Sequence, residues 1–270
     1  MWHNLAQLPR YRGLIQSLVA RELKARYRGS ALGFFWSFVN PLLLLVIYSV
    51  VFRYFLANRA EGIQPYALFL FTGLLPWTWF STALNESSGV LISSGNLIKK
   101  VLFPAEVLPI VSVLANMVHF FLGLPILGVF LGYYALFDAE HKLALHAAEL
   151  IWLPVVIAVQ LILTTGLALL LSALAVHFRD IRDIVANLLT FWFFATPIIY
   201  YWRMVPELKT WLNLNPFTHL AVSYQEILFF AENEFGHKWW LLALGAGSIG
   251  VFLAGYWVFD RLRDSFAEAV

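Results

Sequence analysis

The chain has 270 residues, of which 61% are hydrophobic and 13% are charged, and its formal net charge is +2. A soluble domain carries about 25% charged residues, so this composition excludes an ordinary water-soluble protein. The sequence has no cysteine and no low-complexity repeat, which excludes a disulfide-stabilised scaffold and a disordered chain. We therefore expect an all-α integral membrane protein, because a β-barrel would show alternating segments of about ten residues instead.

The N-terminal segment at residues 9–28 is predicted to form an amphipathic helix in the membrane interface. Leu14, Ile15 and Leu18 recur at helical spacing, whereas Arg12 and Arg21 occupy the other face. Such a helix would be either a simple anchor or a docking surface for a partner, and both interpretations stay open. A cleaved signal peptide is not expected, because the basic stretch and the apolar run after it are too long.

Six runs without Asp, Glu, Lys or Arg are long enough to cross the membrane, since a hydrocarbon core of about 30 Å takes about 20 helical residues. We therefore predict six transmembrane helices in one transmembrane domain that covers residues 1–270. The approximate bounds of the spans are residues 31–52, 66–89, 107–136, 150–176, 184–202 and 239–259.

The distribution of basic residues predicts which side of the membrane the ends of the chain occupy. Six spans place both termini on one side, and basic residues accumulate on the cytoplasmic side. With both termini cytoplasmic, twelve of the eighteen basic residues lie inside. These are Arg10, Arg12, Arg21, Lys24, Arg26, Arg28, Lys99, Lys100, Arg179, Arg182, Arg261 and Arg263. The outer ones are Arg53, Arg59, Lys142, Arg203, Lys209 and Lys238. We interpret the basic residues as membrane anchors and expect no nucleic-acid partner.

Two short inner loops combine turn residues with charges. Residues 91–104 contain a Gly95-Asn96 turn before a basic pair, and residues 177–183 alternate basic and acidic side chains. These loops are either solvated turns or contacts with a soluble protein.

The outer segment at residues 210–230 is apolar but interrupted by Asn215-Pro216 and by Glu226. Irregular backbone within a membrane is tolerated only where protein or water surrounds it. We therefore predict a re-entrant hairpin between the fifth and sixth spans; the alternative is an amphipathic helix on the surface.

Most chemistry-bearing motifs are missing from the sequence. It contains no G-x-x-x-x-G-K-[ST] phosphate loop, no H-E-x-x-H and no G-x-S-x-G. The six uncharged runs that predict the spans contain no Asp, Glu, Lys or Arg by construction, and His119 is more readily explained as a packed histidine than as a proton relay. We expect no catalytic residue, no metal site and no cofactor in this chain.

Aromatic residues are abundant, with 24 Phe, 11 Trp and 11 Tyr. Packing is their usual role in a membrane helix, but aromatic rings could also line a passage for a sugar polymer, because they offer weak and uncharged contacts. The candidates for such a lining lie in the first and fifth spans: Phe34, Phe35, Trp36, Phe38, Tyr48, Phe191, Trp192 and Phe194.

Five blocks in order along nearly the whole chain resemble ABC-2 type permeases that export polysaccharides. The first covers residues 21–33 with Trp36-Ser37 and Asn40-Pro41-Leu42. The others are residues 73–77, 96–104, 178–181, and 196–200 with 215–217. The resemblance implies a homodimer in the bacterial cytoplasmic (inner) membrane, paired with two separate ATP-binding subunits that hold ATP and Mg.

The substrate implied by the resemblance is a lipid-linked polysaccharide moved outward, most closely of the O-antigen type. A capsular polysaccharide or teichoic acid exporter of the same family is the alternative. A small-molecule ABC-2 exporter and a membrane-embedded glycosyltransferase or acyltransferase are further alternatives.

The resemblance also implies residue roles. Coupling to the ATP-binding subunits would fall to Asn96, Leu97, Lys99, Lys100, Phe103, Phe178, Arg179, Asp180 and Arg182. The outer gate would include Asn215, Pro216 and Phe217. Lys24, Arg26 and Arg28 are candidates for the lipid head group, because ammonium and guanidinium groups pair with phosphate. Membrane anchoring is the alternative role of these three.

Overall fold

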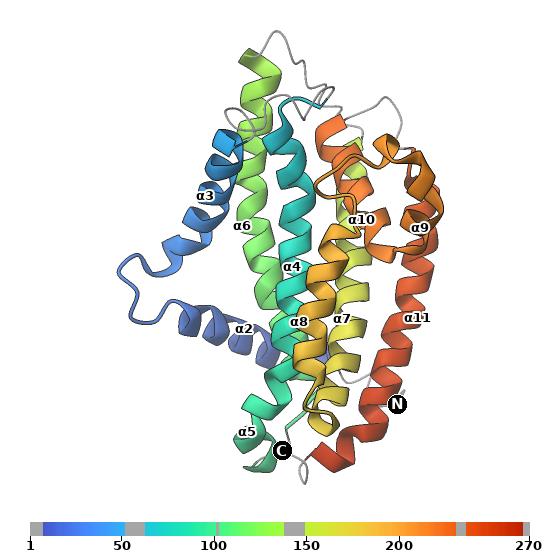
Figure 1. Cartoon of the computed structure of the whole chain (residues 1–270). Helices are drawn as coiled ribbons and strands as arrows, with labels where there is room; N and C mark the ends of the chain where they lie inside the picture. The colour runs from blue at the N-terminus through green and yellow to red at the C-terminus, as the bar shows by residue number, and fades with distance from the viewer. Residues whose placement is uncertain (1–7, 52–62, 101–102, 138–148, 231–235, 267–270) are drawn as a thin grey trace.

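The computed structural model describes residues 8–51, 63–100, 103–137, 149–230 and 236–266 (Figure 1). Throughout these residues the regular structure is helical, which confirms the all-α prediction. Four long helices run side by side as a bundle: α4 (Tyr66–Ser93), α6 (Val107–Phe137), α7 (Leu153–His177) and α11 (Lys238–Leu262). A short helix η5 (Glu149–Trp152) leads into α7.

Five helical stretches within the described residues are long and apolar enough to cross a membrane. They are Gly33–Val50, Tyr66–Ser93, Val107–Phe137, Glu149–His177 and Lys238–Ser265. Five of the six predicted spans therefore have a counterpart. The first combines η2 (Gly33–Phe35) with α3 (Trp36–Val50).

The predicted fifth span, at residues 184–202, is too long as an uninterrupted helix. The structure has α8 (Ile181–Phe194), whose 14 residues rise about 21 Å. It ends before Pro197, which lacks a backbone N–H and disfavours helical backbone at the preceding residue. The chain then bends through residues 195–201 to the short helices η6 (Trp202–Met204) and η7 (Pro206–Leu208).

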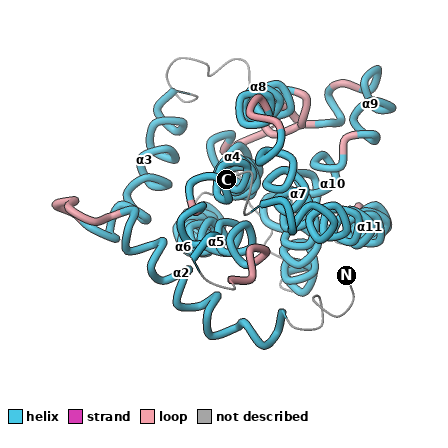
Figure 2. Tube along the Cα trace, turned by 90° about the horizontal axis from the view of Figure 1, so that it is seen from below, coloured by secondary structure: helices cyan, strands magenta, loops and turns pink. Residues whose placement is uncertain are grey.

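The N-terminal helices lie outside the bundle. η1 (Leu8–Tyr11) leads into α2 (Arg12–Arg26), which runs across the lower part of α6 in Figure 1 and along its side in Figure 2. Leu18 of α2 is buried against Val107 and Val111 of α6. The turn to α3 uses Gly29 and Gly33 with φ of 81° and 52°, values that residues with a side chain rarely adopt. A helix thus occupies the predicted segment 9–28, and part of its apolar side packs on protein.

The two ends of the bundle, as drawn in Figure 1, carry different elements. The lower end holds α5 (Gly95–Lys100), the α7–α8 turn, and the end of α11 with η9 (Arg263–Ser265). The upper end holds α9 (Lys209–Leu214) and α10 (Pro216–Gln225), which continues as the π-helical turn η8 (Glu226–Phe230). Residues 217–225 of α10 are all buried, and α10 packs on α4, α7 and α11.

Burial differs sharply between the helices. In its most apolar stretch α4 has 83% of residues buried, whereas the corresponding values are 11% for α3 and 22% for α11. An apolar helix that its own chain leaves open must face lipid or another protein. α4 is therefore the centre of the fold, and α3 is its least covered span.

The tightest helix contact joins α7 to α11 at two glycines. A Cβ atom added to Gly166 would lie 2.6 Å from Phe252 Cα, and one added to Gly255 would collide with the Gly166 carbonyl oxygen. Small residues of this kind let two helix backbones approach closely inside a membrane.

Replacing Gly255 by alanine is expected to separate α7 from α11. The added methyl group meets backbone atoms that cannot rotate away, so we expect a loss of about 1–3 kcal/mol in unfolding free energy. Thermal unfolding of the purified protein in detergent measures it. Gly250→Ala on the same helix is the control, because no atom lies within 4 Å of its Cβ position. Equal loss in both variants would contradict the close-contact argument.

Candidate functional site

A three-residue polar network ties α2, α4 and α6 together in the lower half of the bundle. Arg26 donates from Nη2 to Glu86 Oε2 at 2.5 Å and from Nη1 to Asn116 Oδ1 at 3.0 Å. Asn116 Nδ2 donates to the same Glu86 oxygen at 2.6 Å. The Arg26 and Glu86 side chains are 19% and 36% exposed, and Asn116 is buried. Charge-assisted hydrogen bonds in this partly buried position hold the end of α2 against the bundle.

Glu86 corrects the expectation that the spans lack charged residues. The uncharged run that predicted the second span ends at Asn85, but α4 continues to Ser93 and Glu86 lies within it. Residues 87–92 after the glutamate are small or apolar, and the predicted bounds 66–89 of the second span already included Glu86. A charged residue in a span usually has a partner, and Arg26 is that partner here.

A pocket of about 270 Å³ lies beside this network. Helices α2 and α3 line one side of it, and helices α4 and α6 line the other. Its polar lining combines Arg26, Tyr27, Ser37, Asn40, Thr78, Thr82, Asn116 and His119. The Ser37 hydroxyl donates to the Tyr27 hydroxyl at 2.8 Å. The pocket offers a partly neutralised cation and several hydrogen-bonding groups, a lining suited to an anionic group.

The structure does not bring the three predicted head-group cations together. Only Arg26 lines this pocket, and Glu86 already engages it. Lys24 lines a separate shallow pocket with Tyr27 and Phe34, and Arg28 is exposed.

The predicted coupling residues lie together at the lower end of the bundle (Figure 1). In the first loop Asn96 and Lys99 are exposed on α5, whereas Leu97 and Phe103 pack partly into a lower apolar cluster; the Lys100 side chain lies outside the described part. Those of the second loop are exposed: Phe178, Arg179, Asp180 and Arg182. Both loops therefore present charged and apolar groups at the lower end of the bundle.

The candidate channel aromatics divide into exposed and packed groups. Phe34 and Phe35 near α3, and Phe191 and Phe194 on α8, are between 45% and 72% exposed. Trp36, Phe38 and Tyr48 are half-buried. Trp192 instead packs inward, with its ring centroid 5.4 Å from that of Phe80. α3 and α8 lie at separate edges of the bundle (Figure 2), so the described part of one chain does not enclose a passage between them.

Asn215 joins the end of α8 to the start of α10. Its Oδ1 accepts from Trp192 Nε1 at 2.6 Å and from Phe217 N at 3.0 Å, which caps α10. Its Nδ2 donates to Ala195 O at 3.2 Å and to Thr196 Oγ1 at 2.9 Å. Pro216 occupies the first turn of α10, a position that suits its missing N–H.

The predicted gate residues therefore lie at a buried joint. Phe217 is 0% exposed, and its ring centroid lies 4.8 Å from Trp77 and 4.7 Å from Phe80. The predicted interruption at Asn215-Pro216 coincides with the break between α9 and α10.

Side chains also complete the bent backbone at residues 195–201. Gln225 Nε2 donates to Pro197 O at 2.8 Å, and the Tyr66 hydroxyl donates to Ile199 O. Together with the Asn215 bond to Ala195 O, these contacts give partners to carbonyl groups that a continuous helix would have satisfied itself.

Comparison with known proteins identifies the family. The family of ABC-2 type transporters matches residues 13–229. The chain belongs to this family. This match confirms the predicted resemblance to ABC-2 type permeases. By its family, the chain is a transporter permease subunit.

Individual relatives of this ABC-2 chain cover nearly its full length. It is 40% identical over 267 residues to the O-antigen export system permease protein RfbA of Myxococcus xanthus, with 98% of each chain covered. It is 32% identical over 259 residues to a protein of the same name from Klebsiella pneumoniae, with 94% of each covered. The polysialic acid transport protein KpsM of Escherichia coli is 23% identical over 211 residues, which cover 77% of this chain and 78% of KpsM.

Separating Arg26 from Glu86 is expected to destabilise the fold. We expect Arg26→Met and Glu86→Gln each to lower the unfolding free energy by about 1–2 kcal/mol, and the double variant to lose less than the sum. Glu86 is 36% exposed, which places the effect at the low end for charged hydrogen bonds. Thermal unfolding in detergent measures all three, and Arg28→Met on an exposed cation is the control. If the losses of the two single variants add strictly in the double variant, Arg26 and Glu86 do not stabilise the fold through a shared network.

Removing the Asn215 side chain is expected to open the α8–α10 joint. Asn215→Ala leaves Trp192 Nε1 and Phe217 N without their acceptor, so we expect a loss of about 2 kcal/mol or more. Asn215→Asp keeps the acceptor for both groups but cannot donate to Ala195 O, so it should restore only part of the loss. Asn187→Ala, on the exposed side of α8, should change stability by less than about 0.5 kcal/mol. An alanine variant as stable as the parent would show that the joint is not held by this side chain.

Proposed function

We propose that this chain is the transmembrane permease of an ABC exporter that moves a lipid-linked polysaccharide of the O-antigen type outward from the cytoplasmic side. The observation that carries the proposal is the 40% identity to an O-antigen export permease over 98% of both chains. The weaker similarity to KpsM favours a capsular polysaccharide as the second candidate. Teichoic acid is a further substrate of the same chemical kind. No specific observation favours a small-molecule substrate or a transferase activity.

The energy would come from two separate ABC ATP-binding subunits, which bind ATP and Mg. The sequence of this chain has no phosphate loop of its own. We infer that these subunits dock on the lower end, where Lys99, Phe178 and Arg179 are exposed. Because both loops lie at the same end of the bundle, a single partner could contact both.

The proposed topology places the lower end in the cytoplasm of a bacterium and the bundle in its inner membrane. The inner basic side chains that are described belong to η1, α2, α5, α8, the turns beside these helices, or the end of α11 with η9. The outer basic residues Arg53, Arg59 and Lys142 lie outside the described residues. In this arrangement α8 and the bent segment after it make a sixth, broken crossing. α9 and α10 form the re-entrant hairpin, and α2 lies in the interface.

A second copy of the chain would cover the exposed faces of α3 and α8. On α8, Ile184, Leu188 and Phe191 recur at helical spacing and are all exposed. On α3, Leu43, Val46 and Ile47 are likewise exposed. A homodimer built on these faces would enclose a passage between the two copies. Phe34, Phe35, Phe191 and Phe194 would then line it with aromatic rings that offer no fixed charge to a sliding polymer.

The joint at Asn215 suggests how motion would cross the membrane. The Arg179–Asp180 turn begins α8 at the lower end, and Asn215 links the upper end of α8 to α10. Closing of the ATP-binding subunits would displace the lower turn and, through α8, shift the start of α10. Such coupling requires the contacts at both places to differ between the two states.

Reconstitution with the ATP-binding subunit tests the proposal. Co-expression should yield a complex of two copies of each chain by native mass spectrometry, and it should restore surface polysaccharide in a strain that lacks its own exporter. Charge reversal in Lys99→Glu/Arg179→Glu should lower complex formation by about tenfold, equivalent to about 1.4 kcal/mol.

The matched control is Glu207→Lys, an equally exposed charge reversal at the upper end, which should leave the complex intact. Failure of any ATP-binding subunit to co-purify would refute the proposed function. An equal loss of complex in the control variant would refute the proposed docking surface and leave the proposed function standing.

A further inference from the structure

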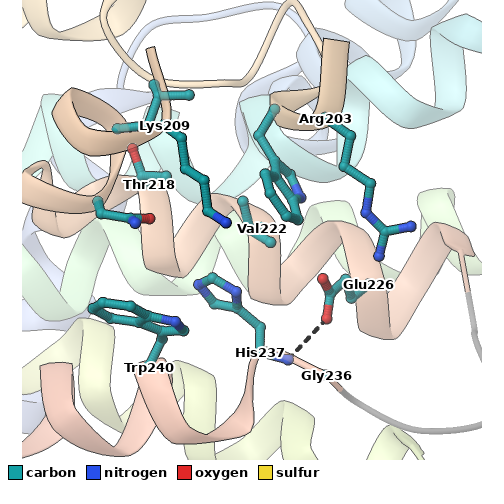
Figure 3. Close-up of a pocket in the computed structure, with 11 residues that line it drawn as sticks. Arg203, Lys209, Thr218, Val222, Glu226, Gly236, His237 and Trp240 are labelled. Carbon is teal, nitrogen blue, oxygen red and sulfur yellow. Dashed lines mark hydrogen bonds between the residues drawn. The ribbon is translucent and has the colours of Figure 1, made fainter. Parts of the chain in front are cut away.

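A second polar pocket lies at the upper end of the bundle, apart from the Arg26 network. It has a volume of about 330 Å³ and is walled by η6, α9, α10, η8 and the start of α11 (Figure 3). Ligand pockets range over about 300–1,000 Å³, so this one suits a small molecule or one unit of a larger chain.

Two buried polar atoms of this pocket lack partners among the described residues. Thr218 is 3% exposed, and its Oγ1 makes no hydrogen bond. The buried indole Nε1 of Trp202 makes none either. An indole N–H can only donate, whereas a hydroxyl can donate or accept. Buried polar groups are normally hydrogen-bonded, so two orphans on one pocket point to a ligand that offers both kinds of group.

Charged side chains enter the pocket from separate elements. Arg203 of η6, Lys209 of α9 and Glu226 of η8 all line it, and Figure 3 shows them projecting toward the same space. The Glu226 carboxylate accepts from the His237 backbone N–H at 3.1 Å. The lining therefore combines cationic donors with an acceptor carboxylate.

A stack of rings makes one wall of the pocket firm. His219 and Trp240 lie with ring centroids 4.8 Å apart and 6° between their planes. His219 Nδ1 lies 2.9 Å from His237 Nε2, and its Nε2 lies 3.0 Å from Asn213 O. Burial, and then the neighbouring His219, lower the pKa of His237 to about 4, so it stays neutral near pH 7. Trp240 is thereby held as a fixed aromatic face of the pocket.

This lining excludes simpler ligands by its chemistry. A site for phosphate alone would gain nothing from the Glu226 carboxylate, and a site for a metal cation would not include Arg203 and Lys209. A sugar ring presents hydroxyl groups that donate and accept at once, and apolar C–H faces that pack on indole rings. Two cations against one carboxylate also tolerate a sugar that carries a negative group.

We propose that this pocket is a carbohydrate subsite that binds one or two sugar units at the upper end of the permease. The inference rests on the proposed function, in which the upper end faces outward and the sugar belongs to the exported polymer. Trp202 and Thr218 supply the hydrogen bonds that the empty lining leaves unmade. Lys209, Arg203 and Glu226 orient the ring, and Trp240 supports one face.

Binding to the purified complex with its ATP-binding subunit tests the subsite. The probes are fragments of two to four sugars, prepared by partial hydrolysis of the surface polysaccharide of the source bacterium, and the readout is saturation-transfer NMR. The decisive variants are Thr218→Val, which removes the hydroxyl and keeps nearly the same shape, and Trp202→Phe, which removes the indole N–H together with part of the ring. Each should weaken fragment binding by about tenfold, the effect of one lost hydrogen bond to a buried partner.

Matched controls are Trp211→Phe and Thr210→Val, whose side chains are exposed on α9 and do not line the pocket. These should bind the fragments as the parent does, and all four variants should keep the parent's unfolding temperature. Unchanged binding in Trp202→Phe and Thr218→Val, or equal loss in the controls, would overturn the subsite. Binding of inorganic phosphate, or of phosphatidylglycerol in nanodiscs, with no binding of sugar would also overturn it and assign an anion site instead.

Export of polysaccharide by the same complexes separates the two proposals. Export by the parent without fragment binding would refute the subsite and leave the proposed function standing. Fragment binding in a complex that exports no polysaccharide would support a carbohydrate site and refute the proposed function.

Discussion

Inside hydrocarbon no water is available to satisfy a backbone amide or a charge, and the fold of this chain follows from that constraint. Long helices satisfy their own backbone, and they make up most of the bundle. Where the helix breaks after α8, side chains take over: Asn215, Gln225 and Tyr66 donate to carbonyl groups of residues 195, 197 and 199. The Glu86 carboxylate also has internal partners, because Arg26 and Asn116 both donate hydrogen bonds to it. These breaks in the apolar helices thus have named internal partners.

The break in α8 also gives the molecule a mechanical joint. A continuous fifth helix would have no such hydrogen bonds to α10. The short α8 is instead hydrogen-bonded at its upper end to Asn215, which caps the first turn of α10. α10 is in turn buried against α4, α7 and α11, so its start cannot move without repacking the bundle. Asn215, whose side chain hydrogen-bonds the bent backbone after α8, therefore also connects α8 and its lower turn to the upper helices. The upper pocket begins on these same helices, which brings the proposed subsite within reach of that motion.

The uneven burial of the helices separates internal packing from outward-facing surface. α4 is enclosed because α3, α6, α7, α8 and α10 all pack on it. α3 remains open although it is strongly apolar, and α8 leaves Ile184, Leu188 and Phe191 exposed. The described charges concentrate at the two ends of the bundle and in the Arg26–Glu86 pair. In the proposed function, such a surface with confined charges is a passive pathway that a partner outside the membrane drives.

The sequence by itself determined the class of the protein, because uncharged runs of helical length and the interruption at Asn215-Pro216 are local properties that any folded state must respect. It also carried the family resemblance, in motifs spread over the chain. Only the tertiary structure decided that Arg26, 60 residues away, is the partner of Glu86, and that η6, α9, α10, η8 and the start of α11 assemble the upper pocket. A pattern read along the chain reports which face of a helix is apolar. It does not report which distant polar group meets it, since that depends on how the helices pack.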